Sequence, residues 1–194
     1  GLSWDASLHS GLAMPTDGGS AFRVRSGRQK VAEANADDPA ATFRLRYTGI
    51  PGLELSASYN YQSDPSQLAG DGLDSGQLFA AHAIYQRSGF GLRALYGQWN
   101  FDGAAVEAAD ADKQTGWYLE PSYRLNEKWG FYARYEDLDA ARDQDKFTQS
   151  QVGFNYWPTD GVVLKMDFRR REFTLPSLSP SDFDAIDLGF GYNF

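Results

Sequence analysis

Several residue types and segments are scarce or missing in this sequence. There is no cysteine among the 194 residues, which excludes disulfide bonds and cysteine-based zinc sites. No stretch approaches the roughly 18 consecutive apolar residues that a membrane helix needs, so the chain is not a helical membrane protein. The 18 lysines and arginines are outnumbered by 26 aspartates and glutamates, and the formal net charge of −8 argues against nucleic acid as a partner.

Residues with catalytic or metal-binding chemistry are also few. The two histidines, His9 and His82, lie outside any recognisable catalytic motif. The acidic segments lack the spacing of an EF-hand calcium loop. The sequence therefore predicts neither a metal site nor a cofactor, and it indicates that the protein is not an enzyme.

What the chain has throughout is two-residue alternation of apolar and polar side chains. In LELSASYNY, positions 53–61, Leu55 and Ala57 share one face, while Glu54 and Ser56 share the other. The final segment, DLGFGYNF, alternates in the same way up to Phe194. This pattern predicts ten β-strands, at about 2–12, 40–49, 53–62, 77–87, 89–101, 115–125, 129–138, 147–157, 162–173 and 184–194.

The connections between these strands alternate between short and long. GIPG, RSG, LNEK and PTDG are rich in the residues of tight turns. Long polar loops are expected at about 13–39, 63–76, 102–114, 139–146 and 174–183. Short turns alternating with long loops are typical of an outer-membrane β-barrel, whose turns face the periplasm and whose loops face outward. The sequence therefore predicts one all-β domain over 1–194, a transmembrane antiparallel up-and-down barrel with a long first extracellular loop at 13–39.

Large aromatic rings bound the apolar stripes at both ends. They are expected at the turn ends (Tyr47, Tyr85, Phe90, Tyr123, Trp129, Tyr156) and at the loop ends (Tyr59, Phe79, Tyr96, Trp117, Tyr135, Phe168). Two such belts match the aromatic girdles at the two water–lipid interfaces. A soluble β-sandwich is the competing interpretation, but its packed core does not accept unpaired charges, and the opposite faces of these strands are charged.

The polar faces of the strands are assigned to the barrel interior. This assignment places basic residues inside (Arg44, Arg46, Arg93, Arg124, Arg134, Lys165, Arg169, Arg171) together with acidic ones (Asp5, Glu54, Glu120, Glu136, Asp167, Asp187). In one interpretation the basic excess raises the local concentration of anions. In the other, the charges form ion pairs that brace the wall, such as Arg134 with Glu136 or Glu120.

The first long loop carries a basic group, Arg23, Arg25, Arg28 and Lys30, with no acidic residue among them. If the loop folds into the barrel, these side chains build an anion filter, because arginine suits planar oxyanions. The alternative is a solvated basic patch that meets lipopolysaccharide phosphates at the rim.

Several segments carry a resemblance to a known family. FRLRYTGIPGLELSASYNYQSD, GFGLRALYGQWNFDG, GWYLEPSYRL, VGFNYWPTDGVVLKMDF and LGFGYNF resemble the C-terminal half of Gram-negative porins related to the phosphate-selective porin O/P group. The resemblance implies a trimeric, roughly sixteen-stranded channel for small, often anionic solutes, with basic residues on the pore wall. The residues it carries over as candidates are Arg23, Arg25, Arg28, Lys30, Arg44 and Arg46. It also implies that the terminal aromatics address the chain to the insertion machinery of the outer membrane.

The chain has about half the length of such a porin. It is either the C-terminal part of a larger barrel or a ten-stranded barrel that closes alone, whose lumen would be narrow because interior width grows with strand number. The end at Phe194 is expected to be the natural C-terminus.

The sequence thus predicts an outer-membrane porin for passive diffusion of small hydrophilic solutes, with a bias toward anions. The candidate pore-lining or anion-binding residues are Arg23, Arg25, Arg28, Lys30, Arg44, Arg46, Arg93, Arg124, Arg134, Lys165 and Arg169. The expected partners are outer-membrane lipid, lipopolysaccharide, small solutes and further copies of the chain in a trimer, but not nucleic acid. The alternatives are a barrel enzyme of the surface protease or lipase type and a structural or adhesion barrel without conductance.

Overall fold

A computed structural model describes residues 1–175 and 181–193 and contains the ten strands that the alternation predicts. The strands are β1 (Leu2–His9), β2 (Ala40–Tyr47), β3 (Leu53–Gln62), β4 (Ser75–Arg87), β5 (Phe90–Asp102), β6 (Lys113–Arg124), β7 (Trp129–Asp139), β8 (Phe147–Thr159), β9 (Val162–Phe173) and β10 (Phe183–Tyr192). Short helices occupy the connections, namely α1 (Ala104–Ala108) and the 3₁₀ turns η1 (Gly18–Ser20), η2 (Val31–Glu33) and η3 (Asp143–Asp145). None of the described helices is long and apolar enough to cross a membrane.

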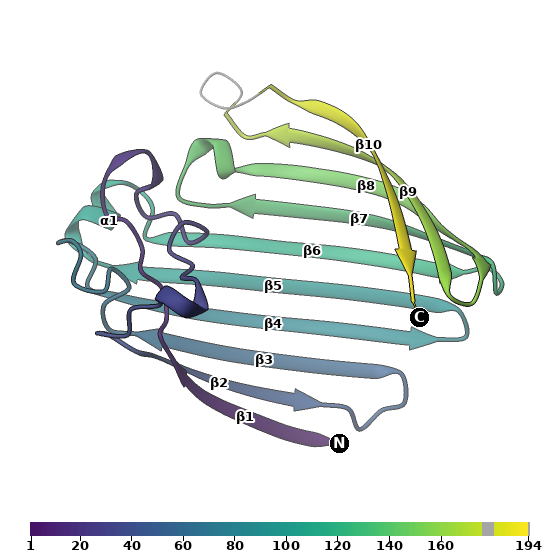
Figure 1. Cartoon of the computed structure of the whole chain (residues 1–194), viewed down its shortest axis with the longest axis horizontal. Coiled ribbons are helices and arrows are strands. Elements are labelled where there is room, and N and C mark those ends of the chain that lie inside the picture. Colours follow the sequence, from purple (N-terminus) through teal and green to yellow (C-terminus); the bar gives the residue numbers. More distant parts are fainter. Residues whose placement is uncertain (176–180, 194) are drawn as a thin grey trace.

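The ten strands form one antiparallel up-and-down sheet in chain order, β1 to β10. The sheet curls so that β9 and β10 turn over one side of its concave face (Figure 1). Among the described residues, β1 and β10 pair only with β2 and β9, so the sheet is open between its first and last strands. A sheet in lipid must have no free edge. The ten strands as described are therefore a sector of a barrel rather than a closed ten-stranded barrel.

The tight turns form where the sequence predicts them. Between β4 and β5, Arg87 faces Phe90, and the two residues that connect them, Ser88 and Gly89, both have positive φ, at 52° and 83°. This conformation matches the right-handed twist of the strands, and glycine adopts it without strain. In the turn between β6 and β7, the Asn126 side chain accepts the backbone N–H groups of Lys128 and Trp129.

The strand boundaries differ from the prediction at the loop ends. The first strand ends at His9 rather than at residue 12, because Gly11 has a φ of 71° and the Gln62 side chain replaces a strand partner for Leu12. β4 and β6 each begin two residues earlier than expected, at Ser75 and Lys113. The predicted loop at 102–114 contains α1. Phe194 and the middle of the predicted loop at 174–183 lie outside the described residues.

The two faces of the sheet have opposite chemistry. The apolar residues of the alternation form the outward, convex face and remain exposed, for example Leu119 at 43%, Phe131 at 46% and Leu164 at 43%. A continuous apolar surface that stays accessible in this way is what a lipid-facing wall requires. The polar partners, such as Glu120 and Arg134, lie on the concave face.

A small hydrophobic core forms at the loop end of the concave face. Met14 and Phe22 from the first loop pack with Leu73, Phe101, Val106 and Ala111, and each of these side chains is almost completely buried. Phe101 lies on the same face of β5 as Arg93, which is the inward face. The segment 10–39 therefore folds back against the inner wall instead of extending away from it, as the dark loops in front of β3–β6 show (Figure 1).

Candidate functional site

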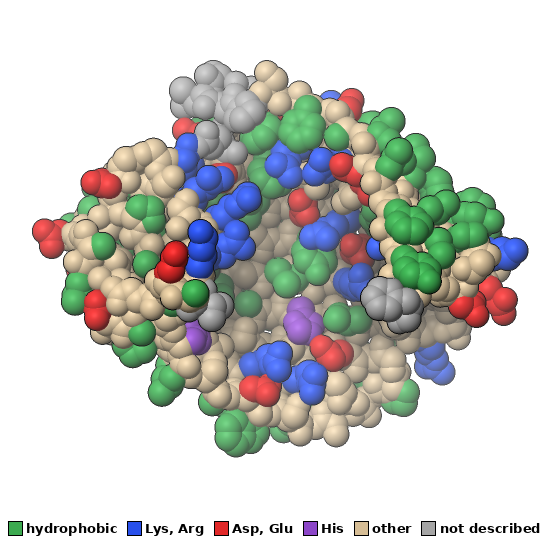
Figure 2. Space-filling view, in the orientation of Figure 1, with side chains coloured by type: hydrophobic (Ala, Val, Ile, Leu, Met, Phe, Trp, Pro, Cys, Tyr) green, Lys and Arg blue, Asp and Glu red, His purple; other side chains and the backbone are tan. Residues whose placement is uncertain are grey.

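The concave face of the sheet encloses a hollow lined by charged side chains. Figure 2 shows lysine and arginine side chains gathered along the rim and the floor of this hollow, with acidic side chains between them. Apolar side chains gather on the outer parts of the same view. The hollow is the part of a barrel through which solute would pass, so its residues are the candidate functional site.

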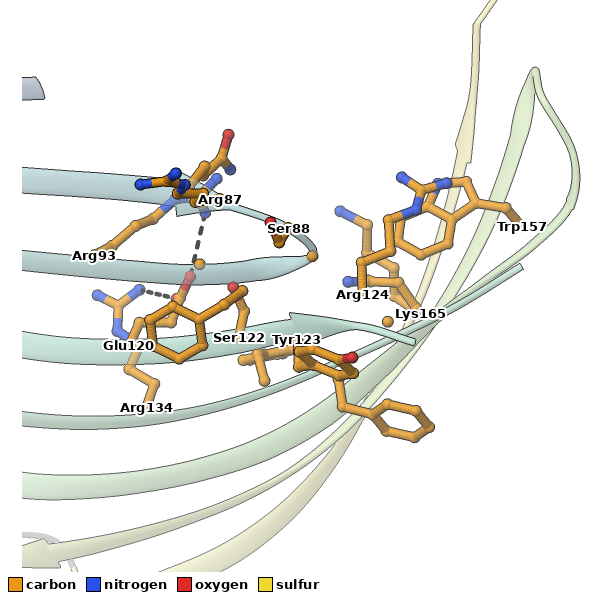
Figure 3. A pocket seen from close by; sticks show the side chains of 18 of the residues that line it. Arg87, Ser88, Arg93, Glu120, Ser122, Tyr123, Arg124, Arg134, Trp157 and Lys165 are labelled. Carbon is orange, nitrogen blue, oxygen red and sulfur yellow. Dashed lines mark hydrogen bonds and ion pairs between the residues drawn. The ribbon is translucent and has the colours of Figure 1, made fainter. Parts of the chain in front are cut away.

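At the turn end, the hollow contains a pocket of about 700 Å³ formed by β4 to β9 and the turn between β4 and β5. Glycines and Ser122 leave the volume of the pocket free, because small inward side chains do not fill the space next to the inner face of the sheet. The described residues that line the pocket include five cationic side chains, Arg87, Arg93, Arg124, Arg134 and Lys165, and one carboxylate, Glu120 (Figure 3). The structure thus brings four of the predicted pore residues together and adds Arg87.

Ion pairs across neighbouring strands organise the centre of this pocket. Glu120 Oε1 lies 3.2 Å from Arg93 Nη1, and Glu120 Oε2 lies 3.6 Å from Arg134 Nη1 (Figure 3). Arg134 Nε also lies 3.0 Å from Glu136 Oε2, and its guanidinium stacks 3.8 Å from the centre of the Tyr118 ring. The predicted bracing of Arg134 by Glu120 and Glu136 is confirmed. Arg93 remains half-exposed, so its charge still faces the hollow.

Two further cations complete the pocket without a carboxylate partner. Arg124 donates to the carbonyls of Asn126 and Glu127 at 3.3 and 2.8 Å, and it stacks 4.3 Å from the Trp157 ring centre. Carbonyl and ring contacts orient this guanidinium but leave its net charge in place. Lys165 forms no ion pair with any described residue. Both charges therefore add to the positive potential of the hollow.

The remaining wall residues are paired more completely. Arg44 Nη2 lies 2.8 Å from Asp5 Oδ2, and Arg169 Nη2 lies 3.2 Å from Asp187 Oδ2. Arg46 contacts the Ser3 hydroxyl at 3.4 Å. These arginines tie the edge strands β1 and β10 to their neighbours, so the structure supports the bracing interpretation for Arg44 and Arg169.

The basic group of the first loop is divided between two environments. Arg23 lies 2.5 Å from Asp145 in the connection between β7 and β8, while Arg25, Arg28 and Lys30 are exposed. The main chain at Arg28 forms a bridge with Leu12, which holds this part of the loop beside the end of β1. Three of the four predicted loop cations are therefore available to solvent.

Neither histidine has the geometry of a catalytic base. His9 Nδ1 accepts the Gly11 N–H at 3.1 Å, and His9 Nε2 lies 2.9 Å from the Thr42 hydroxyl and 3.3 Å from the Asn60 amide nitrogen. His82 Nε2 lies 2.9 Å from Glu54 Oε1, and no hydroxyl in the described part of the chain bonds to this ring. A hydrolase triad needs a hydroxyl on one ring nitrogen and a carboxylate on the other. Among the described residues, His9 contacts the Thr42 hydroxyl but no carboxylate, and His82 contacts the Glu54 carboxylate but no hydroxyl.

The sequence did not predict the hydrophobic core that the first loop forms against the inner wall. Neutral residues also line the pocket, among them Tyr132, Gln151, Asn155 and Trp157, although the candidate pore residues named from the sequence were all charged. The loop core had a signal in the sequence. Trp99 and Phe101 are apolar at inward positions of β5, where polar residues are the rule, and this indicates that something covers them.

The antiparallel sheet, the exposed apolar exterior and the charged hollow together are the features of an outer-membrane β-barrel wall. The chain belongs to the Gram-negative porin family, whose model matches residues 11–174. No curated protein matches the chain at a significant level.

The chain matches two solved structures of outer-membrane proteins. The outer-membrane channel DcaP of Acinetobacter baumannii matches with a TM-score of 0.66 and 15% identity over 100% of this chain. The toluene transporter TodX of Pseudomonas putida matches 81% of this chain and 61% of its own, with a TM-score of 0.45 and 13% identity. This chain spans 59% of DcaP, and the match supports the fold.

Proposed function

We propose that the protein is a passive channel for small hydrophilic solutes with a bias toward anions. The observation that carries this proposal is the pocket at the turn end of the hollow, where five cationic side chains face one carboxylate among the described lining residues. In a narrow water-filled lumen with low-dielectric walls, such an excess raises the local concentration of anions. Because the half-exposed Arg93 and the unpaired Lys165 hold an anion only weakly, it can both enter and leave.

The exposed loop cations are proposed to act in series with this pocket. Arg25, Arg28 and Lys30 lie at the loop end, at the outer mouth of the hollow, whereas Lys165 and Arg93 lie toward the turns. An anion entering from outside therefore meets positive charge at both ends of its path. Arg23 is proposed to be structural, because Asp145 neutralises it.

The assembly is proposed to be larger than the described sheet. Further strands between β1 and β10 would remove the two open edges and close the lumen, as a lipid-spanning sheet requires. The relation to the phosphate-selective porin O/P group and the trimeric state stay proposals that rest on the sequence resemblance. We favour the channel over a barrel enzyme because, among the described residues, neither histidine has both a hydroxyl and a carboxylate partner.

Planar-bilayer recording tests the proposed function. Insertion of the intact protein is expected to give discrete conductance steps whose current persists without any added energy source. If no steps occur at protein concentrations that saturate insertion, the channel is overturned, and a non-conducting structural barrel takes its place.

A further inference from the structure

The lipid-facing wall of the sheet contains a groove over β3, β4 and β5. Its floor consists of four alanines, Ala57, Ala81, Ala83 and Ala94, with Ala57 opposite Ala81 and Ala83 opposite Ala94 in the strand register. Larger side chains stand on both sides, namely Leu45, Tyr47 and Leu55 on one and Tyr96, Trp117 and Leu119 on the other. The groove has a volume of about 690 Å³. It lies between the two aromatic belts, at the depth of the hydrocarbon chains.

A hydrogen-bonded polar group lies on the same outward face, above the groove on the loop side. Tyr59 and Tyr96 donate their hydroxyls to Gln77 and Gln98 at 3.0 and 2.6 Å, and Gln98 Nε2 donates to Asn100 at 2.8 Å. Lys113 is opposite Asn100 in the register and is exposed. Gln77 precedes Ala81 by four residues of β4, which corresponds to ~13 Å along the strand.

This combination has the shape and polarity of a lipid site rather than of an ordinary barrel wall. Other parts of the outward face carry bulky side chains such as Phe131, Met166 and Leu188. A second hollow, over β1 to β3, has about 380 Å³ and is smaller than this groove. Amides and a lysine are costly in hydrocarbon, so their position marks the outer interface, where headgroups lie. An amphiphile with its chains in the groove places its polar part against Gln98, Asn100 and Lys113.

We propose that this face binds one lipopolysaccharide molecule of the outer leaflet. Its acyl chains fill the alanine groove, its sugar hydroxyls and amides bond with Gln98 and Asn100, and one phosphate pairs with Lys113. The loop side faces the outer leaflet in this class of barrel, which selects an outer-leaflet glycolipid over a phospholipid of the inner leaflet. The site lies on the opposite face of the wall from the hollow, so it is independent of solute passage.

Native mass spectrometry of the intact protein, extracted from outer membranes in mild detergent, tests this proposal. The variant Ala83→Leu with Ala94→Leu fills the groove, and Lys113→Ala with Gln98→Ala removes the headgroup contacts. Ala133→Leu, on the outward face of β7 and outside the groove, is the matched control. Equal single-channel conductance of all four proteins verifies that each has folded.

We expect the wild type and the control to retain one lipopolysaccharide, and both test variants to retain about tenfold less. A competition with added phosphatidylethanolamine identifies the class of lipid. Equal retention by the wild type and the filled variant overturns the proposal, and so does preferential retention of phosphatidylethanolamine. Loss of an oligomer in the filled variant also overturns it, because a second copy then occupies the groove.

Discussion

Arg23 of the first loop and Asp145 of η3 form an ion pair of 2.5 Å although they are 122 positions apart in the sequence. A second contact lies beside it, where the Arg142 side chain donates to the Gly19 carbonyl. Both contacts fasten the loop 10–39 to the connection between β7 and β8. The loop is thereby held across the mouth of the hollow at one side by these contacts and at the other by the loop core.

Breaking this ion pair should loosen the loop without unfolding the sheet. Arg23→Ala is expected to speed hydrogen exchange of the segment 16–26, because a partly buried pair of this kind contributes about 1 kcal/mol. Asp145→Ala should have the same effect, and the double variant should add little to either. Arg25→Ala, whose side chain is exposed, is the control. Additive effects of the two changes would contradict a direct pairing.

The hydrophobic core of the loop should matter more than the ion pair. Phe22 is 5% exposed and packs with Phe101 and Val106, so Phe22→Ala is expected to cost about 3 to 5 kcal/mol of local stability. The loop would then leave the inner wall, and single-channel conductance should rise. Leu68→Ala removes a side chain that is 76% exposed and should leave conductance unchanged. An unchanged conductance in Phe22→Ala would show that the loop does not narrow the lumen.

Glu120 should limit the anion bias, because it is the carboxylate that Arg93 and Arg134 share. Glu120→Gln keeps the shape of the side chain and removes one negative charge from the pocket. The reversal potential in a salt gradient is expected to move closer to the equilibrium potential of the anion. The control is Asp5→Asn, which lies on the far edge of the sheet beside Arg44. A shift toward cations in Glu120→Gln would contradict the assignment of the pocket to the solute path.

The open edges of the sheet lead to a prediction about the intact protein. Among the described residues β1 and β10 each have a strand neighbour on one side only, and backbone groups on an open strand edge exchange rapidly unless covered. If further strands close the barrel, amides on both sides of β1 and β10 should be protected in the intact protein in a bilayer. Its mass should then exceed the 21.5 kDa of this chain. Rapid exchange on both edges would indicate that nothing covers them.

The strands were predictable because the two-residue alternation of apolar and polar side chains is a local feature of the sequence and is present in every strand. Leu119 and Glu120, for example, differ in polarity at neighbouring positions, and this alone assigns them to the lipid and to the hollow. The partner of Arg134 was also predictable, since residues on adjacent strands of a hairpin are close in sequence.

The fold of the first loop was not predictable in the same way. The contact between Arg23 and Asp145 joins segments far apart in the chain, and no periodicity connects them. The division of the loop cations into one paired and three exposed side chains depends on this contact. Only the inward apolar residues Trp99 and Phe101 indicated in advance that the inner wall is covered at this end.

The most direct test of the central claim is the reversal potential of the intact channel across a tenfold potassium chloride gradient. The double variant Arg93→Gln with Lys165→Gln is the informative comparison. Lys165 has no ion-pair partner among the described residues, and Glu120 keeps Arg134 at 3.6 Å when Arg93 is replaced, so neither change leaves a carboxylate unpaired. We predict that the wild-type reversal potential lies between zero and the equilibrium potential of chloride. In the variant, we predict that it shifts toward zero. A wild-type reversal potential between zero and the equilibrium potential of potassium would contradict the proposed anion bias. Identical reversal potentials for the two proteins would also contradict it.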